Sequence, residues 1–118
     1  MPMNSSNIEQ GELVVADILF AEQIGTKRRL ALVASTSEFN KTSDDIVVLK
    51  VTSSAKSTPF DIQISNKDTQ NKTLKKDSAI MADFPVTLFK ENIFARPDKI
   101  TGQKLAEVKQ KIRKLYGI

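Results

Sequence analysis

Six side chains suited to acid–base or phosphate chemistry lie at predicted strand ends or in the loops beside them: Glu22, Arg28, Arg29, Thr52, Ser53 and Asp83. Strand ends and loops usually display functional side chains. An arginine can bind phosphate oxygens, a hydroxyl can donate a hydrogen bond, and a carboxylate can take up a proton. Each type also has a structural interpretation. Arginines often form a solvated strand start, Val-Thr-Ser suits a strand that ends in a turn, and an aspartate before a proline turn is often a local cap.

The composition narrows the available chemistry. The chain has no histidine and no cysteine, which excludes the commonest general base, a cysteine nucleophile, thiolate metal sites and disulfides. Glycine-rich phosphate loops, nucleophile elbows, and zinc or calcium spacings are also absent from the sequence. We therefore expect no cofactor and no metal, and any catalysis must use Arg, Lys, Asp, Glu, Ser, Thr or Tyr.

The positive charge is concentrated at the C-terminal end. The 118 residues include 18 Lys and Arg against 14 Asp and Glu, a net charge of +4. Residues 101–118 hold five of the basic residues and one acid, so residues 1–100 are balanced. A basic chain can indicate nucleic-acid binding, but the cations of a solvated helix face explain this excess equally well.

Apolar and β-branched runs predict a series of short strands at 12–20, 28–36, 45–53, 60–64 and 78–84, with a short edge segment at 86–89. The run at 45–53 is nearly continuous, which predicts burial on both faces. Residues 37–44 are expected to be a turn-rich connection, and residues 65–76 a polar loop.

One helix is predicted near the C-terminus. Leu105, Val108, Ile112 and Leu115 recur at helical spacing, and Thr101 is a suitable N-cap. Gly117 suits the position just after the helix. Short strands followed by one helix, with no alternating strand–helix pattern, predict a mainly β, α+β fold or a small barrel.

The length predicts a single domain over 1–118, with residues 1–10 as a flexible extension. No apolar run approaches the ~18–20 residues that span a bilayer. The first ten residues lack the apolar region of a signal peptide, so a cytoplasmic location is expected.

The order of four segments resembles the MazF/PemK family of toxins from type II toxin–antitoxin pairs. These segments are GELVVADILF, KRRLALV, DIVVLKVTS and SAIMADFPVT. That family typically has a "GD-x-V/I" first strand, a loop ending in "R-P-x-L/V-V" and a strand ending in "(V/I)-T-S". The resemblance extends from Gly11 to Tyr116.

The resemblance implies a small, strongly curved antiparallel SH3-like barrel with a C-terminal helix, which forms a two-fold homodimer. It implies a metal-independent endoribonuclease that cleaves single-stranded mRNA by attack of a ribose 2′-hydroxyl, leaving a 2′,3′-cyclic phosphate. It also implies a cognate antitoxin that binds through a largely disordered segment and orders on contact.

The same resemblance assigns roles to individual residues. The family's strand-two arginine corresponds to Arg29, its strand-three threonine to Thr52, and the acid of some PemK-like members to Asp83. Glu22, Arg28 and Ser53 are expected to contact RNA. The general base stays open among Asp83, Glu22 and a perturbed arginine.

Three positions depart from the family pattern. Leu30 replaces the proline after the arginine, Met81 stands where acid-using relatives carry an arginine, and Val86 stands where relatives often have another. Losing one preorganised donor typically costs ~10²–10³ in rate. The sequence is therefore also compatible with a slow enzyme or an inactive relative, unless Arg28 or Arg96 substitutes for the missing cation.

Two other functions remain open at this point. Gyrase-poisoning toxins of the CcdB type share the barrel and end in Trp-Gly-Ile, and this chain ends in Tyr116-Gly117-Ile118. A glycine that caps the helix is a simpler explanation of that tail. The third possibility is a binding module without catalytic activity, whose partner is an antitoxin or another protein.

Overall fold

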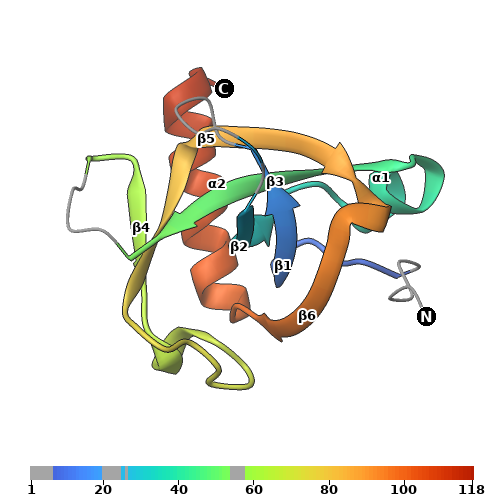
Figure 1. Ribbon diagram of the computed structural model, residues 1–118. Helices are drawn as coiled ribbons and strands as arrows, with labels where there is room; N and C mark the ends of the chain where they lie inside the picture. The colour runs from blue at the N-terminus through green and yellow to red at the C-terminus, as the bar shows by residue number, and fades with distance from the viewer. Residues whose placement is uncertain (1–6, 20–24, 26, 54–57) are drawn as a thin grey trace.

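The computed structural model describes residues 7–19, 25, 27–53 and 58–118 (Figure 1). Its elements in chain order are β1 (Glu12–Ile18), β2 (Lys27–Val33), α1 (Ser37–Thr42), β3 (Asp45–Thr52), β4 (Asp61–Ile64), η1 (Asn66–Asp68), β5 (Ser78–Phe89), η2 (Lys90–Asn92), β6 (Ile93–Lys99) and α2 (Gly102–Tyr116). All strand pairs are antiparallel, in the order β4-β5-β3-β2-β1-β6. Among these residues, no helix is long and apolar enough to cross a membrane.

The mainly β, α+β fold with a C-terminal helix is confirmed, but the curved sheet is not closed into a barrel. The edge strands β4 and β6 do not pair with each other in the described sheet. The segments that follow them meet at one isolated bridge between Thr69 and Ile100. Figure 1 shows β5 and β6 wrapping around β1 and β2, with α2 behind the sheet.

Two apolar clusters fill the two faces of the sheet. The inner core is formed by Ile8, Val14, Ala16, Ile18, Ala31, Val33, Ile46, Val48, Leu88 and Ile93, with Phe84 and Val86 packed against it. The helix-side core is formed by Leu13, Leu32, Leu49, Ile62, Ile64, Ile80, Ala82, Ile100 and Val108, with Leu105 and Ile112 of α2 among the residues that pack on it. Neighbouring residues of β3 enter different cores, which confirms that this strand is buried on both faces.

Helix α2 begins and ends as its sequence predicts. Thr101 is the N-cap, and its Oγ1 accepts a hydrogen bond from the Lys104 amide at 3.3 Å. Gly117 has φ 69°, in the left-handed region, and its amide donates to the Arg113 carbonyl. Val108 is buried on the apolar stripe, so amphipathic spacing correctly identified the face that covers the sheet.

Three elements differ from the sequence prediction. Residues predicted as a turn-rich connection form α1, which is capped by Thr36 and tied to the chain by buried Asn40, whose Nδ2 donates to the Ile8 carbonyl at 3.0 Å. The predicted break at Pro85 is wrong, because β5 runs through it as one strand with an irregular register. Strand β6 was not predicted, since its sequence IFARPDK has little alternation.

Asp98 holds the loop after η1 against β6, between the two edges of the open sheet. Its carboxylate is 3% exposed and accepts hydrogen bonds from the Thr73 hydroxyl at 2.7 Å and amide at 3.0 Å, and from the amides of Asn71 and Lys99, both at 2.8 Å. Burial alone would raise the pKa of Asp98. The four hydrogen bonds outweigh it and lower this pKa from 3.8 to about 2.

Asp98→Asn should lower the free energy of unfolding at pH 7 by about 1–3 kcal/mol, because the amide cannot satisfy the same donors. The stabilisation by ionised Asp98 is complete above about pH 4 and is lost as the pH falls toward 2. Urea denaturation between pH 7 and pH 2 should therefore show that the free energy of unfolding falls less with acid in the variant than in the unmodified chain. Asp77→Asn removes an exposed carboxylate and is the matched control. Equal acid sensitivity of Asp98→Asn and the unmodified chain would contradict this role.

Candidate active site at the end of β2 and β3

Arg29 and Thr52 lie on neighbouring strands, β2 and β3, near the ends of their pairing. Strands β2 and β3 pair Ala31 with Lys50, and continuing this antiparallel register by two residues sets Arg29 opposite Thr52. Side chains alternate along a strand, so Arg29 shares the face of Ala31, which belongs to the inner core. Both residues are half-buried. The arginine and the hydroxyl therefore share one face at the end of the curled sheet.

Lys50 joins these two residues, although the sequence analysis did not select it. It precedes Thr52 by two positions on β3 and so lies on the same face. Its Nζ is 4.7 Å from the centroid of the Phe84 ring, and Phe84 packs against the inner core. The alternation in DIVVLKVTS already pairs Lys50 with Thr52 and was the signal that could have revealed it.

Asp83 lies inside β5 and not at the end of a buried strand, as the sequence had suggested. The register between β3 and β5 shifts here: Leu49 faces Pro85, while Val51 faces Ile80. The four residues 81–84 of β5 therefore lie opposite a single residue of β3, Lys50. Asp83 is exposed in this irregular segment, beside the phenylalanine that contacts Lys50. The structure thus brings Asp83 to the same region of the sheet as Lys50.

Arg28 is directed away from Arg29. It pairs across the sheet with Asp17, whose Oδ1 lies 3.4 Å from the arginine Nε, and its guanidinium carbon lies 3.6 Å from the centroid of the Phe94 ring. Both charged side chains of this ion pair are about half exposed. Successive side chains on a strand point to opposite faces, so the two adjacent arginines serve different surfaces.

Arg96 is engaged in a separate ion pair and does not supply a cation here. Its Nε and Nη2 donate to the two carboxylate oxygens of Glu12 at 2.7 and 2.6 Å, and Nη2 also donates to the Asn7 carbonyl at 3.1 Å. The hydrogen bonds to Glu12 raise the pKa of Arg96, while burial acts in the opposite direction. This pair fastens β6 and the N-terminal segment to β1.

Of the remaining two predicted residues, the structure describes only Ser53. Ser53 is exposed just after β3 and, with Leu30, Leu74 and the two lysines Lys75 and Lys76, lines a groove of about 510 Å³. Glu22 lies outside the described residues. The structure therefore gathers Arg29, Thr52 and Asp83 near Lys50 but leaves Arg28 and Ser53 elsewhere.

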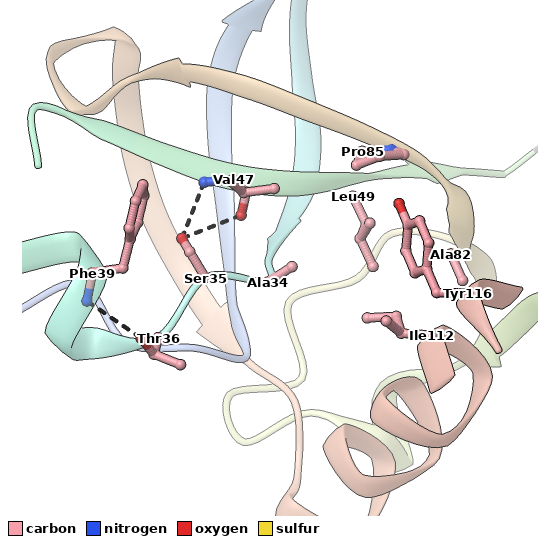
Figure 2. Close-up of a pocket in the computed structure, with 10 residues that line it drawn as sticks. All are labelled: Ala34, Ser35, Thr36, Phe39, Val47, Leu49, Ala82, Pro85, Ile112 and Tyr116. Carbon is pink, nitrogen blue, oxygen red and sulfur yellow. Dashed lines mark hydrogen bonds between the residues drawn. The ribbon is translucent and has the colours of Figure 1, made fainter. Parts of the chain in front are cut away.

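A mostly apolar pocket of about 380 Å³ opens between α1, β3, β5 and the end of α2. Figure 2 shows Tyr116 and Ile112 of α2 beside Leu49, Ala82 and Pro85, with Phe39 across the pocket. Phe39 is 41% and Tyr116 61% exposed, and Ile118 beyond them is 83% exposed. Large side chains left this exposed on one apolar surface are typical of a contact with another protein.

The group around Arg29 suits an anion with several oxygens. A guanidinium can donate two parallel hydrogen bonds, an ammonium adds a mobile charge, and the threonine hydroxyl can donate a third contact. Among the described residues, no group of three or more His, Cys, Asp or Glu side chains could hold a metal ion. This arrangement can bind a phosphate and stabilise negative charge on it.

Comparison with solved structures places this fold among known toxins. MazF from Deinococcus radiodurans is 27% identical, with 94% of this chain and 97% of that chain aligned at a TM-score of 0.73. A MazE–MazF structure from the same organism is 27% identical, with 95% and 98% aligned at 0.74. An "Endoribonuclease from Mycobacterial species" is 15% identical, with 98% and 97% aligned at 0.76, and supports the fold alone. No curated protein sequence matches the chain.

A family model matches nearly the whole described chain. Residues 9–116 match the family described as "PemK-like, MazF-like toxin of type II toxin-antitoxin system". The matched range begins before β1 and ends at the last residue of α2, so it includes every strand of the sheet and the residues around Arg29. The chain therefore belongs to the PemK-like, MazF-like toxin family of type II toxin–antitoxin systems.

Proposed function

We propose that this toxin is a metal-independent endoribonuclease that cleaves single-stranded RNA, with mRNA as its substrate in the cytoplasm. The observation that carries the proposal is the pairing of Ala31 with Lys50, since the same register, continued by two residues, sets Arg29 opposite Thr52 on one face of the sheet. The D. radiodurans relatives support it, since they are MazF toxins of the same fold. A neighbour named as an endoribonuclease shares the fold at lower identity.

The proposed reaction is an internal transesterification. The ribose 2′-oxygen attacks the adjacent phosphorus, the bond from phosphorus to the 5′-oxygen breaks, and a 2′,3′-cyclic phosphate remains. The 2′-proton passes to a base, for which Asp83 is the proposed residue, and the leaving 5′-oxygen takes up a proton from water. Arg29 meets the non-bridging oxygens with two hydrogen bonds, and the Thr52 hydroxyl donates to the same phosphate.

The proposed protein partner is a cognate antitoxin. One solved neighbour is an endoribonuclease in complex with its cognate antitoxin, and others are MazE–MazF complexes. The chain is also proposed to act as a homodimer, in which the apolar surface around Phe39 and Tyr116 (Figure 2) meets its symmetric copy. An aromatic residue at the centre of such a contact typically contributes a large share of the binding energy.

Arg29→Ala and Thr52→Ala should each slow RNA cleavage by about 10²–10³-fold, because each removes one preorganised donor to the phosphate. Purified protein is incubated with a long single-stranded RNA in EDTA, and the ends of the fragments are mapped. Cyclic phosphate and 5′-hydroxyl ends are expected.

Lys109→Ala, an exposed cation of α2, is the matched control and should cleave normally. RNA that stays intact at high protein concentration would refute the proposal. If expression still arrests growth and deletion of Gly117 and Ile118 abolishes this toxicity, gyrase becomes the target. If expression causes no arrest, a binding module remains.

Tyr116→Glu should convert the dimer to a monomer, because it places a charge in the proposed apolar contact. A loss of about 2 kcal/mol raises the dissociation constant about 30-fold. Analytical ultracentrifugation over a range of concentrations measures this change. Phe89→Glu replaces another aromatic, 55% exposed at the end of β5, and should leave the dimer intact. A monomeric unmodified chain, or equal dissociation constants for both variants, would contradict this interface.

A further inference from the structure

The proposed reaction concentrates negative charge on one phosphate, and Arg29 and Thr52 meet only part of it. Charge develops on two non-bridging oxygens and on the leaving 5′-oxygen as the phosphorus becomes five-coordinate. One guanidinium and one neutral hydroxyl supply a single positive charge at this surface. The neighbouring cations Arg28 and Arg96 form ion pairs with Asp17 and Glu12. A second cation on the Arg29 face would complete the site.

Lys50 stands at the position that such a cation requires. It pairs directly with Ala31 across β2 and β3, and Ala31 is two residues from Arg29 on the same face. It is also two residues from Thr52 along β3. Neighbours at diagonal positions on one sheet face lie about 7–8 Å apart, within the reach of a lysine and an arginine that bind one phosphate. The three residues thus share one face of the sheet at neighbouring positions.

Phe84 restrains the lysine at this position. The Lys50 Nζ lies 4.7 Å from the ring centroid, which is within the range of a cation–π contact. The ring is itself held, since Phe84 packs against the inner core. The irregular stretch of β5 at 81–84 brings it over Lys50. A half-buried ammonium held on a fixed ring loses less conformational entropy on binding a phosphate than an exposed lysine does.

We propose that Lys50 is the second phosphate-binding cation of the active site and that Phe84 is the residue that positions it. This inference rests on the proposed ribonuclease function. Lys50 donates to the non-bridging oxygen that Arg29 does not bind, and its charge offsets the negative charge that the phosphate gains as the 2′-oxygen attacks. Phe84 acts only through Lys50.

Lys50→Met tests the charge, because methionine keeps an unbranched apolar chain but has no cation. Single-turnover cleavage of an RNA oligonucleotide should slow by about 10²-fold. Binding is measured on the same oligonucleotide with a 2′-deoxy nucleotide at the cleavage position, which cannot react. The logarithm of the binding constant is plotted against the logarithm of the salt concentration, and the magnitude of this slope should fall by about one unit in the variant.

Lys50→Arg should restore most of the cleavage rate, because it restores the charge and can still contact the ring. Phe84→Leu keeps the apolar packing but removes the ring, so cleavage should slow by several-fold while thermal unfolding changes little. Combining it with Lys50→Met should add no further loss, as expected of a residue that acts through another. Lys41→Met, an exposed cation of α1, is the matched control for charge alone.

The two proposals fail in different ways. If the unmodified toxin cleaves RNA and Lys50→Met cleaves and binds equally well, the role of Lys50 is overturned while the ribonuclease function stands. If the unmodified toxin does not cleave, the ribonuclease function fails. The 2′-deoxy oligonucleotide then decides on Lys50: weaker binding with a smaller salt slope in Lys50→Met supports an anion site, and unchanged binding or none at all overturns it.

Discussion

Strand β3 is fixed by packing on both of its faces, and the candidate site depends on this fixed register. Val48 lies in the inner core and Leu49 in the helix-side core, with exposures of 0% and 2%. A slip of one residue would exchange their environments and would turn Lys50 and Thr52 toward the helix. The apolar half of the strand therefore determines where its polar end points. Two half-buried polar side chains are held on one face by residues that touch no substrate.

The elements that could be predicted from the sequence are those with a strong local pattern. Helix α2 has an apolar stripe and two clear caps, and β3 has an uninterrupted apolar run. Helix α1 has no such apolar stripe. It depends on the Thr36 cap and on the hydrogen bond of buried Asn40 to the distant Ile8 carbonyl. Strand β6 contains Pro97 and charged residues and exists because β1 offers it a partner. That the sheet stays open was also not predictable, since the amides of Asn71 and Thr73 in the loop beside β6 donate to the Asp98 side chain and not to a strand backbone.

The candidate site was predictable in part for the same reason. The order of the motifs related Arg29 to Thr52, and the register of β2 and β3, continued by two residues beyond the pair of Ala31 and Lys50, sets them at facing positions. Strand alternation alone separates Arg28 from Arg29 and adds Lys50. The surroundings of Asp83 were not predictable, because they follow from a register shift between distant strands. Such a bulge re-aims side chains locally, which lets one segment contain an exposed carboxylate and a ring that packs on the inner core.

The exposed cations of α2 and the half-buried cations Arg29 and Lys50 lie in different parts of the molecule. The net excess of +4 belongs to residues 101–118, and α2 packs its apolar stripe on the helix-side core. Its exposed cations therefore lie on the opposite side of the sheet from Arg29 and Lys50. Exposed charges separated by more than about 10 Å are largely screened at physiological salt, so in the proposed function the α2 cations attract RNA only weakly and in a salt-dependent way. In the proposed reaction, charge stabilisation at the phosphate comes from the half-buried residues Arg29 and Lys50, where fewer ions and less water intervene. Different cations thus serve the proposed chemical step and the long-range attraction of RNA. Added salt should therefore lower the rate of association with RNA more than the rate of the chemical step.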